Sequence, residues 1–213
     1  MSGYDARNFS QEFAKRTMAN NNYILNKVNS EENNKLYEVT QLLNSLMGIA
    51  VLPYEMNKDA LKKITSRAKQ SKSYKDLQHF IDKLVKSHQL TSTYKSETEN
   101  RIYVNQFLRH IRNATSHSGN NAMSILPLLG GIEIEYILFY DRYPSLNVDE
   151  VEDQDLQEFA MAISIKELEE MIILISTFYQ ESGIGEQDKT EKIKKGEERV
   201  RRLLPECKFF KKR

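Results

Sequence analysis

The sequence has little of several residues that mark other classes of fold. Cys207 is the only cysteine among 213 residues, which excludes a disulfide framework and a multi-cysteine zinc site. Glycine occurs eight times and proline four times. Because turn-rich β folds use many glycines and prolines, this scarcity favours a helical protein.

The chain also lacks an excess of one charge and a long apolar run. It has 31 Lys and Arg against 30 Asp and Glu, a net charge of +1. This balance excludes a globally basic nucleic-acid binder and an acidic decoy, although it permits a local basic patch. The longest apolar stretch, residues 42–52, is interrupted by polar residues and is too short to span a bilayer. Residues 1–13 lack the apolar segment of a signal peptide. We therefore expect a cytoplasmic protein with no membrane partner.

Length and charge distribution predict one domain followed by a tail. We expect residues 1–185 to form a single helical domain and residues 186–213 to form a charged, net-basic C-terminal tail. The tail has 11 Lys and Arg against six Asp and Glu, a net charge of +5, so the rest of the chain carries −4. Two interpretations of the tail stay open: an arm that attracts RNA, or a solvated helical terminus. Its mixed signs favour the second.

Apolar residues at three- and four-residue spacing predict the helices. The run Asn20–Asn22 is a poor helix interior and predicts a break in the first helix. Pro53 is predicted to end the second and strongest helix. Ser164 and Glu167 have the spacing of a capping box at the start of the last one. The expected helices cover residues 11–28, 36–52, 59–68, 74–88, 100–117 and 166–179.

One segment has the alternation of a strand. Residues 132–140 are rich in β-branched and aromatic residues, and residues 159–163 are the candidate antiparallel partner. A two-stranded hairpin is marginal alone, so this one must pack on the helices. The predicted fold class is mainly α: a helical bundle with a small antiparallel β-hairpin inserted before the last core helix.

The most informative helix contains the sequence FLRHIRNATSHSG, residues 107–119. Arg109, Asn113 and His117 form a row at i, i+4 and i+8, and Arg112 flanks this row. The opposite side is apolar. The spacing alone also fits an ordinary solvated helix face, which commonly carries Arg, Asn and Ser. We expect His110, at the flank of the row, to be a partly buried or interface histidine.

The whole phrase from Leu108 to Gly119 resembles the signature of HEPN domains. Arg112 and Asn113, followed by three residues and His117, match the Arg-Asn-x-x-x-His form of that signature. The resemblance covers roughly residues 36–180. It includes the strong helix that ends in Leu-Pro-Tyr-Glu at residues 52–55 and the strand pair before the last helix.

The resemblance implies a HEPN-like helical bundle that forms a homodimer, with the two motifs meeting across a two-fold axis as one RNA-cleaving site. It implies Arg112, His117 and Asn113 as catalytic residues, and no metal and no cofactor. Arg109 is the candidate for RNA binding, with a structural ion pair as the alternative. Ser116 is the second RNA-binding candidate, with a helix-end hydroxyl as its alternative.

The implied function is a metal-independent endoribonuclease that leaves 2′,3′-cyclic phosphate and 5′-OH ends. The expected biology is a bacterial toxin or anti-phage defence effector, for which an antitoxin or regulatory partner protein is expected. Two alternatives stay open. One is a non-catalytic HEPN-type module that binds a nucleotide or a protein. The other is a helical adaptor whose motif helix is only an interface.

Overall fold

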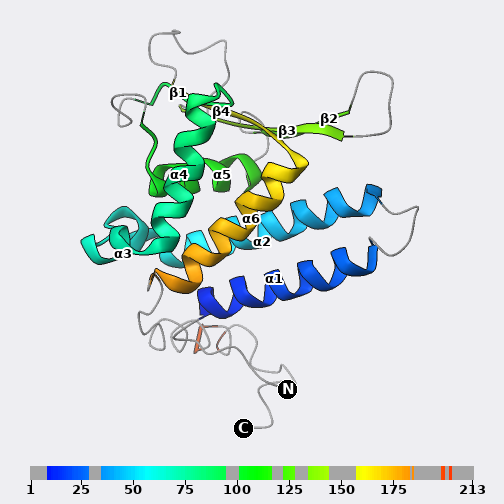
Figure 1. Cartoon of the computed structure of the whole chain (residues 1–213). Coiled ribbons are helices and arrows are strands. Elements are labelled where there is room, and N and C mark those ends of the chain that lie inside the picture. Colours follow the sequence, from blue (N-terminus) through cyan, green and yellow to red (C-terminus); the bar gives the residue numbers. More distant parts are fainter. Residues whose placement is uncertain are drawn as a thin grey trace, which may run out of the picture.

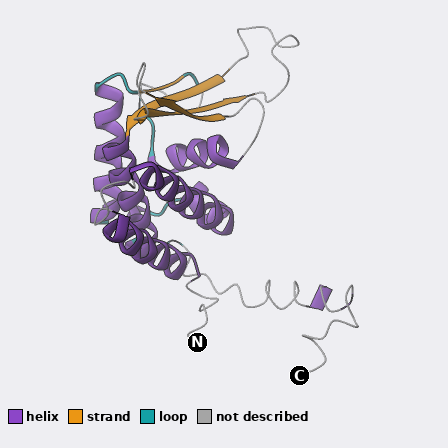
Figure 2. Ribbon diagram, turned by 90° about the vertical axis from the view of Figure 1, so that its right-hand side faces the viewer, coloured by secondary structure: helices purple, strands orange, loops and turns teal. Residues whose placement is uncertain are grey.

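The computed structural model combines a helical bundle with an antiparallel sheet at one end (Figures 1 and 2). Its helices are α1 (Phe9–Val28), α2 (Lys35–Lys62), α3 (Ser66–Gln70), α4 (Lys72–Lys86), α5 (Val104–Ser116) and α6 (Ile165–Glu181). Its strands are β1 (Leu90–Ser92), β2 (Ala122–Pro127), β3 (Ile134–Tyr143) and β4 (Gln157–Ser164). The structure describes residues 9–28, 35–94, 101–116, 122–127, 134–143, 157–182, 184, 198, 199 and 202.

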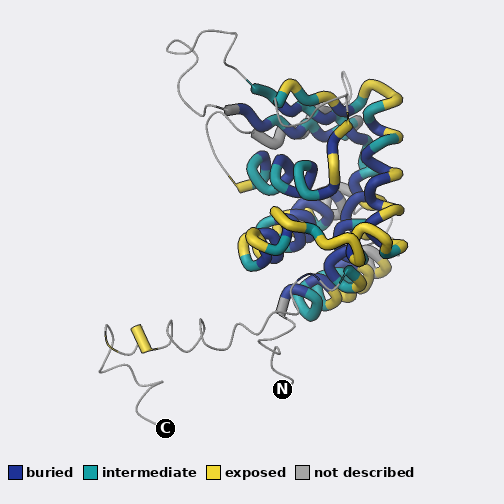
Figure 3. Tube along the Cα trace, turned by 90° about the vertical axis from the view of Figure 1, so that its left-hand side faces the viewer, coloured by how far each residue is buried: buried dark blue, intermediate teal, exposed yellow. Residues whose placement is uncertain are grey.

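The helices share one core with the inner face of the sheet. α1 packs on α2 and α6, α2 packs on α5 and α6, and α4 packs on α6. Figure 3 shows the buried stretches turned toward the interior between these elements. Large side chains with almost no exposure fill this interior, among them Leu46, Phe80, Phe107, Phe159 and Phe178. The predicted mainly α bundle is therefore confirmed, with every described helix too short or too polar to cross a membrane.

Two helix interruptions predicted from the sequence are wrong. α1 runs through the Asn20–Asn22 segment because Asn21 is buried and its Oδ1 accepts a 3.0 Å hydrogen bond from Ser45 Oγ of α2. α2 runs through Pro53 to Lys62. The turn after Pro53 is fixed by Asn57, whose Nδ2 donates to the Pro53 carbonyl (2.8 Å) and to Ser10 Oγ (2.7 Å). Tertiary contacts therefore outweigh the local cost of these residues.

The predicted hairpin is present as β3 and β4, and it belongs to a larger sheet. All four strands are antiparallel in the order β1-β4-β3-β2. Alternate residues of the two central strands are buried against the helices: Ile137, Phe139 and Asp141 on β3, and Phe159, Met161 and Ile163 on β4. Asp141 pairs with Phe159 across the strands. The inner face of the sheet thus carries one carboxylate among apolar side chains.

The last helix begins with the capping box that the sequence predicts. Ser164 Oγ accepts from Glu167 N, and Glu167 Oε2 accepts from Ser164 N at 2.9 Å. Gln89 Nε2 also donates to Glu167 Oε2 at 3.0 Å, which ties the turn before β1 to the start of α6. Partial burial raises the pKa of Glu167, but the hydrogen bonds from Ser164 and Gln89 outweigh it and hold the pKa below its usual value.

This lowered pKa predicts a pH-dependent contribution to stability. A carboxyl whose pKa is lower when folded stabilises the protein above its unfolded pKa, and the gain disappears as pH falls through the folded pKa. We expect Glu167→Gln to lower the free energy of unfolding by about 1 kcal/mol or less at pH 7. The deficit should shrink as pH falls through the lowered folded pKa of Glu167. Urea unfolding between pH 3 and 7 measures it, with the exposed Glu170→Gln as the control. A deficit that is constant with pH would contradict this.

Candidate functional site

Helix α5 carries the motif residues Arg112 and Asn113. Packing fixes where the helix begins and which of its sides faces the core. Its apolar side is buried as predicted, through Val104, Phe107, Leu108, Ile111 and Ala114. Gln78 of α4 holds the start of the helix, because its Oε1 accepts from Val104 N (3.2 Å) and its Nε2 donates to the Ile102 carbonyl (2.9 Å). The polar side of α5 is therefore held in one orientation toward α2 and β3.

His110 is completely buried, which goes further than the partial burial expected from the sequence. Its Nε2 lies 3.0 Å from Arg109 Nη2, and its Nδ1 lies 2.6 Å from Asp141 Oδ2. A guanidinium only donates, so Nε2 must accept and Nδ1 must carry the proton that it donates to Asp141. The ring also stacks on Phe159 at 4.5 Å and 14°. With both ring nitrogens bonded inside the core, His110 is a structural histidine.

Asp141 connects this buried histidine to the motif. Its Oδ2 also accepts from Asn113 Nδ2 at 3.0 Å, and the residue is 1% exposed. The other end of the same amide, Asn113 Oδ1, accepts from Arg112 Nη1 at 2.7 Å. Asn113 therefore cannot turn over without losing both bonds. The chain of contacts from Asp141 through Asn113 fixes one edge of the Arg112 guanidinium.

The other edge of Arg112 faces α2. Arg112 Nη2 forms an ion pair with Glu55 Oε1, and its Cζ lies 6.0 Å from the centre of the Tyr54 ring. Burial raises the pKa of the Tyr54 hydroxyl, while the positive charges of Arg109 and Arg112 lower it less strongly. The phenol therefore stays protonated at neutral pH, so it is able to donate a hydrogen bond but not to act as a base.

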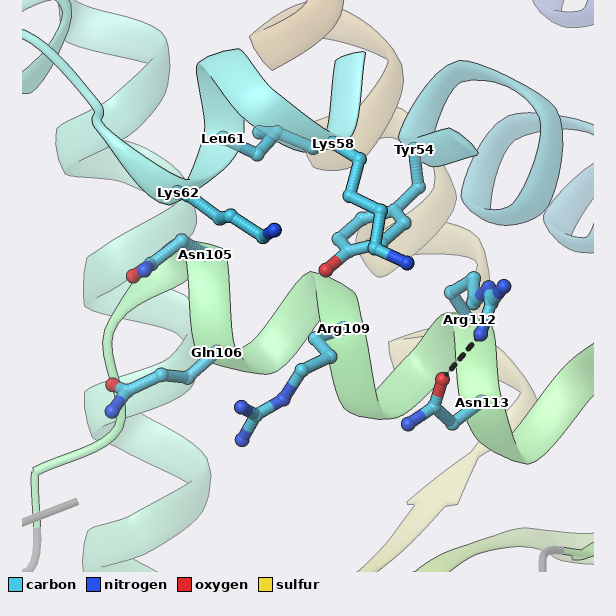
Figure 4. Close-up of a pocket in the computed structure, with 9 residues that line it drawn as sticks. All are labelled: Tyr54, Lys58, Leu61, Lys62, Asn105, Gln106, Arg109, Arg112 and Asn113. Atoms are coloured by element: carbon cyan, nitrogen blue, oxygen red, sulfur yellow. Dashed lines mark hydrogen bonds between the residues drawn. The ribbon is translucent and has the colours of Figure 1, made fainter. Parts of the chain in front are cut away.

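These side chains line a cavity of about 280 Å³ between the end of α2 and the outer side of α5 (Figure 4). Four of its residues are cationic, and none of its lining residues is acidic. The wall from α2 consists of Tyr54, Lys58, Leu61 and Lys62, and the wall from α5 consists of Asn105, Gln106, Arg109, Arg112 and Asn113. Such a lining favours an anionic ligand and offers it amide and guanidinium donors.

The structure brings together some of the predicted site residues and not others. Arg109, Arg112 and Asn113 line the same cavity. Arg109 contacts His110 and lies over the Tyr94 ring, with 5.2 Å from its Cζ to the ring centre. Ser116 does not line the cavity; its Oγ donates to the Arg112 carbonyl at 2.7 Å. His117 lies outside the described residues.

Several residues of the site were not predicted from the sequence. Asp141 had one available signal, because it is an acidic residue directly after an apolar strand segment that packs on the bundle. Glu55 lies in the segment at residues 52–55 that carries part of the resemblance. Lys58 and Lys62 had no signal, since a helix predicted to stop at Pro53 places them elsewhere.

Comparison with known proteins gives one family. The model of the family described as HEPN pEK499 p136 matches residues 1–197, which is most of the chain. No curated protein and no solved structure matches the chain. Within the residues that the structure describes, no cluster of three His, Cys, Asp or Glu is placed to hold a metal ion. With its helical bundle, its Arg-Asn motif on α5 and a family match over 1–197, the chain belongs to the HEPN pEK499 p136 family.

Proposed function

We propose that this protein is a metal-independent endoribonuclease in which Arg112 and His117 are the catalytic residues and Asn113 positions Arg112. The observation that carries the proposal is the Arg112 guanidinium, which lines a cationic cavity and is held by a buried network through Asn113 and Asp141. Membership of a HEPN family supports the same activity. By itself, the family match identifies a HEPN-domain protein, and the nuclease activity is our proposal.

The proposed reaction follows from the chemistry of these groups. Attack of a ribose 2′-OH on the adjacent phosphorus needs a base for the hydroxyl and an acid for the leaving 5′-oxygen. Imidazole, with a pKa near ~6.5, suits both roles near neutral pH, and His117 would supply it. The fork of Arg112 would bind the oxygens on which negative charge grows. The products carry 2′,3′-cyclic phosphate and 5′-OH ends, and DNA is not a substrate because it lacks the 2′-OH.

We place the complete site at a homodimer interface. One histidine per motif cannot be both base and acid in a single step, so two copies of His117, one from each protomer, would divide the roles. A two-fold axis beside α5 brings the same surface of each copy together. Asn113 and Asp141 are then positioning groups for Arg112. The role that fits such an enzyme is that of a toxin or anti-phage effector restrained by an antitoxin or regulatory partner.

The test is cleavage of total RNA by the purified protein in the presence of EDTA, followed by analysis of the new ends. We expect fragments with 2′,3′-cyclic phosphate and 5′-OH ends, and no cleavage of single-stranded DNA. Cleavage that requires a divalent cation, or that leaves 5′-phosphate ends, would contradict the mechanism. If a folded, dimeric protein cleaves no RNA but binds nucleotides, the non-catalytic binding module becomes the better interpretation.

A further inference from the structure

The cavity extends well beyond the proposed catalytic residues. Along α5 its lining runs from Asn105 to Asn113, a separation of eight positions, or about 12 Å at 1.5 Å per residue. Along α2 it runs from Tyr54 to Lys62. Figure 4 shows Lys62 beside Asn105 at one end, Lys58 near the middle, and Arg112 beside Asn113 at the other end. The positive charges are therefore distributed along the cavity and do not converge on one point.

Two acidic residues near the cavity, Glu55 and Asp59, do not cancel its positive charge. Glu55 pairs with Arg112 at one end. At the other end, Asp59 Oδ1 lies 4.0 Å from Lys62 Nζ, and both side chains are mostly exposed, so this contact is weak. Tyr54 and Leu61 are buried and supply the apolar part of the α2 wall. Cations spread along a groove with amides and a ring between them suit a nucleic-acid strand, in which negative charges repeat at regular intervals.

We propose that Lys58 and Lys62 bind two phosphodiesters of the RNA strand, one per lysine, next to the phosphodiester of the same strand that Arg112 holds. This inference rests on the proposed function, because it takes the ligand of the cavity to be the substrate strand. The two lysines lie four residues apart on α2, so their side chains leave the same face of the helix. They contribute affinity and set the path of the strand, and they take no part in bond cleavage.

The test measures binding of a fluorescein-labelled 12-mer RNA with 2′-O-methyl groups throughout, which cannot undergo 2′-OH attack. Wild type is compared with the double variant Lys58→Ala/Lys62→Ala and with the matched control Lys63→Ala/Lys69→Ala. Both variants lose two positive charges. Lys63 and Lys69 are exposed and do not line the cavity. Circular dichroism verifies that each variant is folded, and Lys58→Arg/Lys62→Arg tests whether charge alone restores binding.

We expect the cavity variant to raise Kd by about tenfold or more, and to reduce the slope of log K against log salt by about 1.4, for two lost phosphate contacts on a single strand. The control should stay within about twofold of wild type, and the arginine variant should retain binding. Equal Kd values for the cavity variant and the control would overturn the proposal. So would displacement of the strand by AMP at equal affinity, because that result identifies a site for a single nucleotide.

Because the 2′-O-methyl 12-mer cannot be cleaved, the measured Kd does not depend on catalysis. If wild type binds the 12-mer through Lys58 and Lys62 but cleaves no RNA, the nuclease proposal fails and the strand site stands. If wild type cleaves RNA with the expected ends but both double variants bind alike, the strand site fails and the nuclease proposal stands.

Discussion

Replacing His117 with alanine is expected to lower the rate of RNA cleavage by about 10⁴-fold or more, because a homodimeric site would lose its general base and its general acid together. Arg112→Ala is expected to cost about 10²- to 10³-fold, the usual effect of removing one donor to a developing oxyanion. Single-turnover cleavage of a labelled RNA in EDTA measures both losses.

Matched controls separate this loss from general effects on the protein. His79→Ala removes an exposed imidazole of α4, and Arg101→Ala removes an arginine whose recorded ion-pair partner, Asp82, is outside the cavity. Both should cleave RNA at the rate of wild type.

Arg112→Lys retains the positive charge but not the two parallel N–H donors of the guanidinium, so its cleavage rate should stay at least about tenfold below that of wild type. Equal rates for His117→Ala and His79→Ala would refute the assignment of His117.

The second large effect is on stability. Asp141→Ala is expected to lower the free energy of unfolding by about 3 kcal/mol or more, since it removes the acceptor for a fully buried histidine and for the half-buried Asn113 amide. His110 Nδ1 and Asn113 Nδ2 both bond to Asp141 Oδ2, and the His110 and Asp141 side chains are 0% and 1% exposed. Urea unfolding followed by circular dichroism gives the difference.

A conservative replacement tests the cause of that effect. Asp141→Asn keeps an oxygen that can face both donors, so it should recover much of the stability lost in Asp141→Ala. The control is Asp59→Ala, whose side chain is 88% exposed, with an expected change within about 0.5 kcal/mol. A loss in Asp141→Ala no larger than that in Asp59→Ala would show that the buried network contributes little.

Periodicity predicted the helices because each of them buries one regular stripe. The strongly amphipathic α4 and α5 are the clearest cases, and Ser164 with Glu167 marked the start of α6. The errors occurred where a distant partner compensates a locally unfavourable residue. Asn21 is satisfied by Ser45 of α2, and the turn after Pro53 is secured by Ser10 of α1. Neither partner is visible in a local window.

The outer strands were missed for a different reason. β1 has only three residues, and the segment of β2, Ala122–Pro127, ends in a proline that argues against a strand. β1 gains its hydrogen bonds from β4, which is far away in the sequence, and β2 gains its own from the next strand, β3. Part of the site could be predicted, because Arg112 and Asn113 belong to one motif. The role of Asp141 could not be predicted, because its one local signal does not indicate a partner: Asn113 lies 28 residues away and meets Asp141 only when the sheet packs on α5.

The continuation of α2 past Pro53 has a consequence for how the charge of the cavity can be changed. The last turns are anchored by Leu61, which is 1% exposed, whereas Lys58 and Lys62 project from the same turns and are exposed. Because exposed positions tolerate substitution within about 0.5 kcal/mol, the charge along this wall can be rewritten without disturbing the core. If the cavity binds RNA as proposed, this wall is a place where evolution or a protein engineer can change which RNA is bound while the network behind Arg112 is left intact.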